Sequence, residues 1–427
     1  MKVNLHSMKL KEIIISVIVA FMFMIVAYLV MNLSFTLPMA IEKPKLKLLE
    51  NIRGCLPIDN TSSWVDSVLC IDVSHDQVLA MEYEGENAIG EISVTDHEKL
   101  LKLLQALKNK NYRYILLDVL FDKYVSQPID SQLFKFIADM PNIVIPIPEK
   151  PIANDCLMPK AAHAKYATPH WDGGFTKYPY KLDNQSSIPL FMYEELSNHK
   201  IFNPISCIWW DRGLARNSVF LTFGLKEDSL EILNMGRCLG YPVNGVQMRA
   251  RINNPSLTEG KYIIIGDFKN DRHGTFLGSM SGPMINFNAY VALVNGHHRI
   301  NPILMSIILL ILSVFCYAIL YSSKSWRILV KASQVKVITV LLVISCFILY
   351  VTWHIIYDVY IYVFLFWSLH ISAKFGVGYK VIPTIVYLIF LIFFVLVFSL
   401  LPEDIIAYPL LFLALFLPFY KDILKLK

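Results

Sequence analysis

The sequence is poor in charge. Asp, Glu, Lys and Arg make up 17% of its 427 residues, whereas about 25% is usual for a globular protein. Hydrophobic residues make up 55%, which excludes an intrinsically disordered chain, and only 7 cysteines exclude a small disulfide-stapled scaffold. The apolar excess lies near the N-terminus and after residue 302. The sequence therefore predicts an integral membrane protein with one large water-facing domain between these regions.

Motifs for nucleotide and metal chemistry are also missing. The chain has no P-loop, H-E-x-x-H, EF-hand, kinase or Rossmann glycine pattern, and no two cysteines are spaced C-x-x-C. We therefore expect no metal, no cofactor and no enzymatic activity. Five cysteines lie in the water-facing region: Cys55, Cys70, Cys156, Cys207 and Cys238. Because their number is odd, buried free thiols are favoured over a disulfide framework, in which Cys55 and Cys70 would be the nearest pair.

Long apolar runs are abundant. A helix of about 20 apolar residues crosses the hydrocarbon core of a bilayer. The uncharged run over 13–33 follows three lysines and predicts an uncleaved transmembrane anchor rather than a cleaved signal peptide. A membrane domain over 302–420 is predicted to contain five more helices, at 302–321, 337–357, 359–373, 381–401 and 405–420. One long span over 337–373 is the alternative, but two spans match the bilayer thickness better.

Charge predicts the orientation of these spans. With six spans, all the Lys and Arg residues outside 34–302 fall on one side of the membrane, which the positive-inside rule identifies as the cytoplasm. We therefore expect residues 1–12 and the tail 421–427 in the cytoplasm and the domain 34–301 outside a bacterial inner (cytoplasmic) membrane. Basic and acidic residues nearly cancel within that domain, which excludes a nucleic-acid-binding surface.

Strand-like and helix-like segments alternate within residues 34–301. Short apolar runs predict buried strands at 67–73, 114–120, 142–147 and 262–265. Helices are predicted at 130–140 and 286–294, and after a capping box formed by Thr95 and Glu98. This alternation predicts an α/β domain with a mainly parallel central sheet, with an insertion over the polar stretch 148–188.

Acidic residues follow three of the predicted strands. They form the pairs Asp72 and Asp76, Asp118 and Asp122, and Asp267 and Asp271. Functional groups of parallel sheets gather beyond the carboxyl ends of the strands, so facing carboxylates could bind a metal ion or act as an acid/base pair. The alternative, which we favour, is that they cap helices or accept hydrogen bonds from loop N–H groups.

The loop 271–275 is the densest polar group in the sequence. Its residues Asp271, Arg272, His273 and Thr275 could bind an anionic ligand or relay protons. A turn stabilised by its own hydrogen bonds is the favoured alternative. The segment 278–282 resembles a nucleophile elbow, but Met280 stands where G-x-S-x-G requires serine. His297, His298 and Arg299 are expected to contact lipid headgroups, and Trp209 and Trp210 either line a pocket or lie at the membrane interface.

Two blocks of this domain carry a family pattern. The first comprises Gly260–Gly266, Asp271, His273, Gly274, Thr275, Gly278, Met280, Gly282, Asn288 and Ala289; the second comprises Leu116–Phe121, Asp130 and Leu133, with Ile71 and Asp72 upstream. They resemble the CHASE type 2 domains, which are extracytoplasmic sensory modules, although Phe276, Ser281 and Asn286 depart from that pattern. The strand-end positions and this resemblance together select the following ligand-binding or motif residues: Asp72, Asp118, Asp122, Asp130, Gly266, Asp271, His273, Thr275 and Gly282.

The resemblance implies a membrane-bound extracytoplasmic sensor. It would bind an unknown small molecule or periplasmic protein and, because the predicted cytoplasmic segments are too short for a catalytic domain, signal through a separate effector. The expected partners are the lipid bilayer and a separate signalling or membrane-complex protein, with a homodimer left open and no nucleic acid. One alternative is a structural or assembly subunit of a membrane complex that senses no ligand. Another is a hydrolase in which Asp271 and His273 act with Asp72 or Asp118.

Overall fold

The computed structural model divides the chain into two compact units, each with its own elements. It describes residues 10–31, 48, 62–84, 87–122, 124–148, 156–164, 174–175, 177–182, 185–197, 201–202, 208–210, 213–215, 218–220, 225–242, 248–275, 278–296 and 302–321. The first unit comprises Met1–Ile41, Ile201–Asn217 and Arg299–Lys427. The second comprises Glu42–Lys200 and Ser218–His298, and it contains every acidic pair singled out above.

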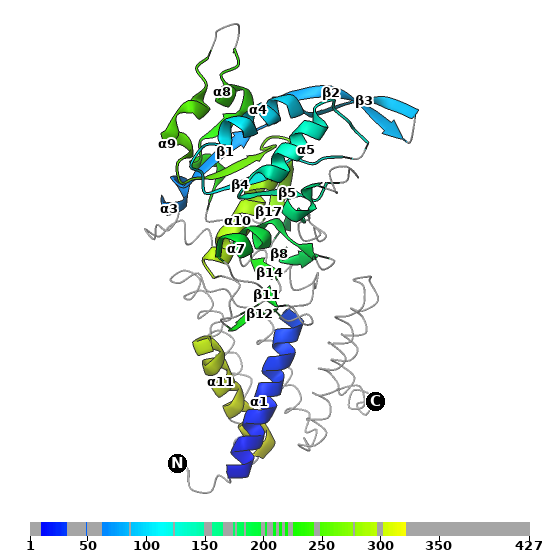
Figure 1. Ribbon diagram of the computed structural model, residues 1–427. Helices are drawn as coiled ribbons and strands as arrows, with labels where there is room; N and C mark the ends of the chain where they lie inside the picture. The colour runs from blue at the N-terminus through cyan, green and yellow to red at the C-terminus, as the bar shows by residue number, and fades with distance from the viewer. Residues whose placement is uncertain are drawn as a thin grey trace. The chain divides into compact units, whose positions relative to one another are not determined.

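A six-stranded sheet forms the centre of the second unit, and all of its strand pairs are parallel (Figure 1). Across the sheet the strands are β15 (Ile232–Asn234), β1 (Val68–Asp72), β16 (Tyr262–Gly266), β4 (Tyr114–Asp118), β5 (Ile143–Pro146) and β6 (Ala161–Ala162). Four of them, β1, β4, β5 and β16, coincide with the short apolar runs read from the sequence. Because β16 lies between β1 and β4, the loops that follow these three strands meet at one edge.

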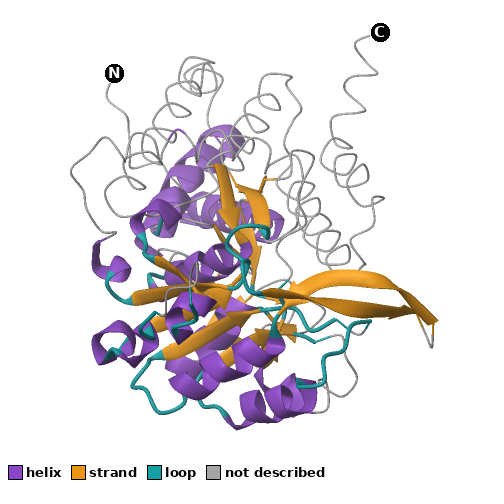
Figure 2. Ribbon diagram, turned by 90° about the horizontal axis from the view of Figure 1, so that it is seen from above, coloured by secondary structure: helices purple, strands orange, loops and turns teal. Residues whose placement is uncertain are grey.

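Helices cover both faces of this sheet (Figures 1 and 2). One face carries α4 (His97–Leu107), α5 (Asp130–Asp139) and α8 (Met235–Leu239). The leucines of α4 are buried there against Ile115, Leu117, Ile263 and Ile265. The other face carries α10 (Gly282–Val294), which packs on β16, β4 and α7 (Ile188–Ser197). Strand residues alternate between the two faces, so each strand contributes to both cores.

Helix α4 starts one residue later than the sequence predicts. Thr95 ends a strand, and the N-cap is Asp96, whose carboxylate accepts hydrogen bonds from the N–H groups of Glu98 and Lys99, each at 3.0 Å. Aspartate accepts from the orphan N–H groups of a first turn as well as threonine does. Glu98 instead pairs with Lys102 one turn along the helix.

Short elements complete the second unit. They are α3 (Ser62–Val65), α9 (Pro255–Thr258), and the 3₁₀ helices η2 (Met158–Lys160), η3 (Glu227–Ser229) and η4 (Arg251–Asn253). The small sheets are β18-β17-β7 (Gly278–Ser281, Arg272–Thr275, Gly174–Phe175), β14-β8 (Ser218–Phe220, Lys177–Pro179) and β10-β9 (Gln185–Ser186, Lys181–Leu182). The described parts of the predicted insertion 148–188 thus carry short strands.

A two-stranded ribbon extends from the second unit (Figure 2). It consists of β2 (Gln77–Glu84) and β3 (Asn87–Thr95), which pair antiparallel with a bulge between Glu82 and Tyr83. The ribbon is inserted between β1 and α4. The strands of this ribbon are not among those predicted from the sequence.

The first unit contains two long helices and a small sheet. The helices are α1 (Leu10–Met31) and α11 (Pro302–Tyr321), and the sheet β11-β12-β13 comprises Ile201–Phe202, Ile208–Trp210 and Gly213–Ala215. The two helices pack on each other, and Val19, Ala20, Ile308 and Leu312 are buried.

The membrane predictions require correction. Among the helices of the described residues, none has both the length and the apolar character needed to traverse a bilayer. This contradicts the predicted fold with about six transmembrane helices and the predicted multi-pass localisation in a bacterial inner membrane. The prediction failed because an apolar run does not by itself distinguish a span from a helix that buries an apolar face against another helix. The spans predicted at 337–357, 359–373, 381–401 and 405–420 lie outside the described residues.

The four described cysteines are free thiols. Cys70 and Cys238 are buried in the second unit, Cys156 is half-buried, and Cys316 is buried in α11. Burial raises the pKa of the Cys70 thiol, and it raises the pKa of Cys238 to about 12. Cys70 and Cys238 are therefore protonated and unreactive at neutral pH. Cys55, Cys207 and Cys346 lie outside the described residues.

Candidate functional site at the carboxyl edge of the sheet

The register of the sheet brings the last residues of four strands into one row. Asp72 lies opposite Asn234 on one side and Gly266 on the other, and Gly266 lies opposite Asp118. Residues 115 and 117 of β4 pack towards α4 and α5. Because side chains alternate along a strand, Asp118 lies on the opposite face, where α10 begins.

Gly266 allows α10 to begin directly over the sheet. A Cβ atom at this position would lie 2.4 Å from Cγ of Pro283, 3.1 Å from the carbonyl oxygen of Asp118 and 3.2 Å from its Cβ. Pro283 belongs to the first turn of α10, where proline is tolerated because its missing N–H needs no partner. The absence of a side chain at Gly266 therefore sets the distance between α10 and the carboxylate of Asp118.

A polar chain runs from Asp118 into the core. The side-chain amide of Asn286, one turn into α10, donates to Oδ2 of Asp118 at 3.0 Å. The amide oxygen of Asn286 in turn accepts a hydrogen bond from the hydroxyl of Tyr178 on β8. Asn286 and Tyr178 are fully buried. Asp118 itself keeps part of its surface accessible, although protein surrounds its carboxyl group densely.

The environment of Asp118 favours its protonated form. Burial, together with the carboxylate of Asp271, raises its pKa to about 7, against the smaller opposing effects of the Asn286 hydrogen bond and of His273. Asp271 and His273 form a pair of their own, with 2.8 Å between Oδ1 and Nε2. Asp271 and His273 thus have opposite effects on the ionisation of Asp118 at this edge of the sheet.

Asp118 and Asp271 each have one carboxylate oxygen that accepts no hydrogen bond from the described residues. Oδ2 of Asp118 accepts from Asn286, but Oδ1 accepts no hydrogen bond in the described structure. Likewise Oδ2 of Asp271 has none, while Oδ1 contacts His273. Protein surrounds the Asp118 carboxyl densely, so an ionised Oδ1 without a donor is costly there and can accept a proton or a ligand that donates a hydrogen bond. The Asp271 side chain is 40% exposed, so its Oδ2 faces no such cost.

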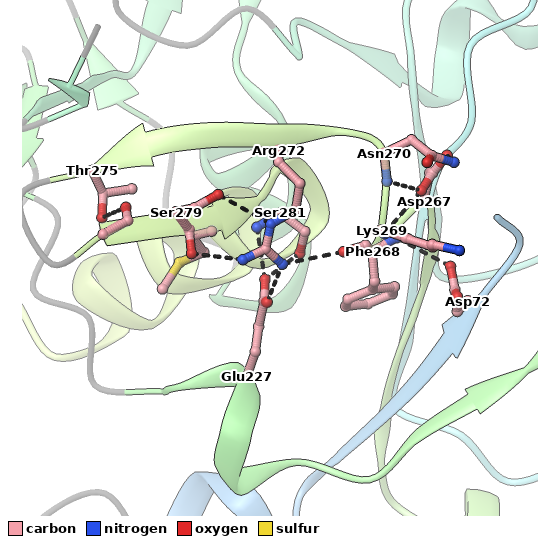
Figure 3. A network of polar contacts seen from close by, with 12 residues as sticks. Asp72, Glu227, Asp267, Phe268, Lys269, Asn270, Arg272, Thr275, Ser279 and Ser281 are labelled. Carbon is pink, nitrogen blue, oxygen red and sulfur yellow. Dashed lines mark hydrogen bonds and ion pairs between the residues drawn. The ribbon is translucent and has the colours of Figure 1, made fainter. Parts of the chain in front are cut away.

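The side chain of Arg272 stabilises its own hairpin through hydrogen bonds (Figure 3). Its guanidinium donates to the Glu227 carboxylate, to the carbonyl oxygen of Phe268 at 3.2 Å, and to Ser279 twice, at the hydroxyl (3.2 Å) and the carbonyl oxygen (2.7 Å). Glu227 also accepts from the N–H and hydroxyl of Ser281, each at 2.6 Å. Four of the five guanidinium N–H groups of Arg272 thus donate to protein, which leaves one for a ligand.

The described contacts of Thr275 and Gly282 are structural. Thr275 is buried and donates its hydroxyl hydrogen to the carbonyl oxygen of Gly278 at 2.7 Å, which closes the β17–β18 turn. Gly282 is the first residue of α10, and its N–H donates to the carbonyl oxygen of Asp271 at 2.9 Å. That backbone contact fixes Asp271 relative to α10.

The other acidic candidates hold loops and helix ends. Asp72, which is 5% exposed, accepts hydrogen bonds from the N–H groups of Ser74 and Phe268. Asp122 accepts from the N–H of Tyr124 at 2.7 Å. Asp76 pairs with Lys99, and Asp267 accepts from the N–H groups of the residues that follow it. Such contacts are the common role of aspartate beyond a strand.

Asp130 belongs to a separate group on the other face of the sheet. Its Oδ1 lies 2.6 Å from Nδ1 of His97, and its Oδ2 accepts from the N–H of Gln127 at 3.1 Å. Asp130 and His97 are both buried, and the His97 ring contacts Phe121 edge-on. This pair joins the starts of α4 and α5.

Three residues of the site region escaped the sequence analysis as candidates. They are Asn286, Tyr178 and Glu227. A fourth, Asn288, was noted only as part of a motif; it is fully buried and exchanges two hydrogen bonds of 3.0 Å with the backbone of Leu225, two residues before Glu227. The signal available in the sequence was the occurrence of two asparagines in an otherwise apolar helix.

The described residues contain no group of three or more His, Cys, Asp or Glu side chains arranged to hold a metal ion. Trp209 and Trp210 form strand β12, and His297 and His298 lie outside the described residues. The chemistry that this edge can offer is therefore that of its two carboxylates, His273 and Asn286.

The fold and the site together define an α/β protein with a parallel sheet and a polar group at the carboxyl edge of its central strands. Comparison with known proteins adds no closer assignment: no family model, no curated protein and no solved structure matches the chain. The resemblance to CHASE type 2 domains thus receives no support from these comparisons, and the membrane location that it implies is contradicted by the described helices.

Proposed function

We propose that this chain is a ligand-binding protein of the receptor type, whose site at the carboxyl edge takes a small molecule carrying a protonated amine. Binding would be passed to a separate protein. The observation that carries this proposal is the unpaired Oδ1 of Asp118, deep in the second unit yet on a residue that remains partly accessible.

The negative charge of Asp118 and Asp271 favours a cationic ligand. The carboxylate of Asp271 disfavours the ionised form of Asp118, so Asp118 holds a proton near pH 7 or requires a positive neighbour. An ammonium group donating to both free oxygens would replace that proton and satisfy both acceptors. Asn286 holds the Asp118 carboxyl in place by donating to its Oδ2, which leaves Oδ1 for the ligand.

The hydrolase alternative has less support. Three hydroxyl groups of the hairpin that carries His273 already make hydrogen bonds to protein: Ser281 donates to Glu227, Thr275 donates to Gly278, and Ser279 accepts from Arg272. A serine or threonine nucleophile needs a base within hydrogen-bond reach, and none of these three hydroxyls has His273 as a described partner.

The test is a thermal-shift screen of the full chain with monoamines and diamines, each compared with an alcohol of equal size. Amines are expected to raise the melting temperature and the alcohols are not, because a ligand that binds only the folded state stabilises it. The shift should be larger above pH 7 than below it, since Asp118 is ionised there.

Two variants make the screen specific. Asp118→Asn should abolish the amine-dependent shift, whereas Asp122→Asn, which removes a loop carboxylate from the same strand end, should retain it. A screen in which no amine stabilises the chain, or in which Asp118→Asn responds like the wild type, would exclude this site. Absence of any ligand would favour the alternative of a structural or assembly subunit.

A further inference from the structure

The β2–β3 ribbon exposes apolar side chains that the rest of the unit does not cover. Leu79, Met81 and Tyr83 are 71%, 38% and 43% exposed. They alternate along β2 and therefore lie on one side of the ribbon. Ser93 pairs with Leu79 across the ribbon, and its hydroxyl hydrogen-bonds the side chain of Gln77, which places these residues on the same side. We call Leu79, Met81, Tyr83, Glu91 and Ser93 the ribbon face.

The ribbon buries few of its own side chains. Its residues are mostly exposed, and among them only Ala80 is buried. Two strands without a third are marginally stable in water. On its outer side β2 gains a bridge between Glu82 and Val125, but β3 has no second neighbour among the described strands. A strand with an open edge and an apolar face is a template for another strand.

The ribbon is also uniformly acidic. Residues 77–95 contain Glu82, Glu84, Glu86 and Glu91 but no Lys, Arg or His. Two copies of such a ribbon would repel each other, which disfavours pairing with a second copy of this chain. A basic segment would be attracted.

We propose that the β2–β3 ribbon is a docking surface for a second protein, which adds an extended segment of alternating apolar and basic residues as a strand along β3. The segment's apolar side chains would extend the ribbon face, and its basic side chains would lie on the opposite side, which carries Glu82 and Glu84. Backbone hydrogen bonds to the open edge of β3 supply affinity, and the alternation supplies specificity. This proposal does not depend on the amine site.

The probe is a labelled synthetic peptide alternating lysine and valine, with a glutamate and valine peptide as its counterpart. Fluorescence anisotropy with the full chain should show binding of the first peptide and not the second, and the binding should weaken with salt because part of it is electrostatic. Equal binding of both peptides, or of neither, would overturn the proposal.

Variants locate the contact. The double substitution Leu79→Ser with Met81→Ser should weaken binding at least about tenfold, because both side chains leave the ribbon face. Val294→Ser is the matched control, since it removes a side chain that is 43% exposed at the far end of α10, and it should leave binding unchanged. Glu84→Lys, on the side of β2 opposite the ribbon face, should weaken binding of the lysine peptide by charge repulsion, which separates charge from loss of apolar contact.

Sedimentation of the unliganded chain completes the test. A monomer under all conditions agrees with docking of a different protein. A dimer that the Leu79→Ser and Met81→Ser substitutions dissociate would show instead that a second copy occupies the ribbon face, and the proposal would then be wrong.

Discussion

At the scale of single residues, Gly266 has the tightest steric constraint at the candidate site. Its missing side chain lets Pro283 approach the end of β16 and so places Asn286 over Asp118. The contact at risk involves a rigid proline ring and the backbone of a central strand, neither of which can rotate away.

Gly266→Ala should therefore destabilise the protein by about 1–3 kcal/mol, the usual range for overpacking a well-filled core. Chemical denaturation monitored by circular dichroism measures it. The matched control is Gly90→Ala in β3, where an added Cβ meets nothing within 4 Å, and which should change stability by less than about 0.5 kcal/mol. Equal stability of both variants would show that α10 can shift away from the sheet.

Contacts between residues far apart in the chain could not be predicted from the sequence. Asp118 could be chosen from the sequence because it ends a strand, but its partner Asn286 is 168 positions away and could not. The same applies to Arg272 and Glu227, which are separated by 45 positions. Pairing across such distances depends on strand order, and no local pattern encodes the insertion of β16 between β1 and β4.

At the scale of elements, the hairpin β17–β18 is held to η3 by one ion pair that is largely shielded from solvent. The side chains of Arg272 and Glu227 are 33% and 14% exposed, and Glu227 also binds both polar groups of Ser281 at the N-cap of α10. The pair thus connects the hairpin that carries His273 with the helix that carries Asn286.

A double-mutant cycle with Arg272→Met and Glu227→Gln should give a coupling energy of about 1–2 kcal/mol, above the range of exposed pairs. The control cycle uses Arg251 and Glu231, whose side chains are 48% and 60% exposed and whose coupling should lie near zero. Urea denaturation of each variant provides the free energies. If both cycles gave the same coupling, the Arg272 pair would have no special role in fixing the hairpin.

Elements differ in how well their sequences predict them. The strands β1, β4, β5 and β16 are short apolar runs bounded by polar residues, so their positions follow from the sequence within about two residues. The ribbon strands β2 and β3 bury almost no surface, so the two-residue apolar period of Leu79, Met81 and Tyr83 was not recognised as a strand. The N-cap of α4 was predicted at Thr95, one residue before the observed Asp96, because adjacent Thr and Asp residues are both good caps.

At the scale of the whole molecule, composition proved a weaker guide than local pattern. Apolar runs led to a prediction of membrane spans that the described helices contradict. The division of the chain was also not visible in the sequence, because residues 201–217 belong with the first unit although both of their flanks belong to the second. Contacts between distant segments decide such boundaries, and composition does not record them.

The pH dependence of stability follows from the whole fold, because the fold sets the pKa of Asp118. Its pKa rises from 3.8 to about 7, chiefly through burial and then through Asp271. The folded chain thus binds this proton more tightly than the unfolded chain does, so the free energy of unfolding should fall as pH increases from about 4 to 7.

Asp118→Asn removes this titration and should flatten that decline. At about 1.4 kcal/mol per pKa unit, reduced for the accessible part of the side chain, the variant should exceed the wild type by about 1–3 kcal/mol above pH 7 and show no such advantage below pH 4. Urea denaturation across this range measures the two curves, with Asp122→Asn expected to follow the wild type. Should the Asp118→Asn curve decline as steeply as the wild-type curve, the proton would reside elsewhere, and the carboxyl edge would lose the electrostatic basis on which amine binding was proposed.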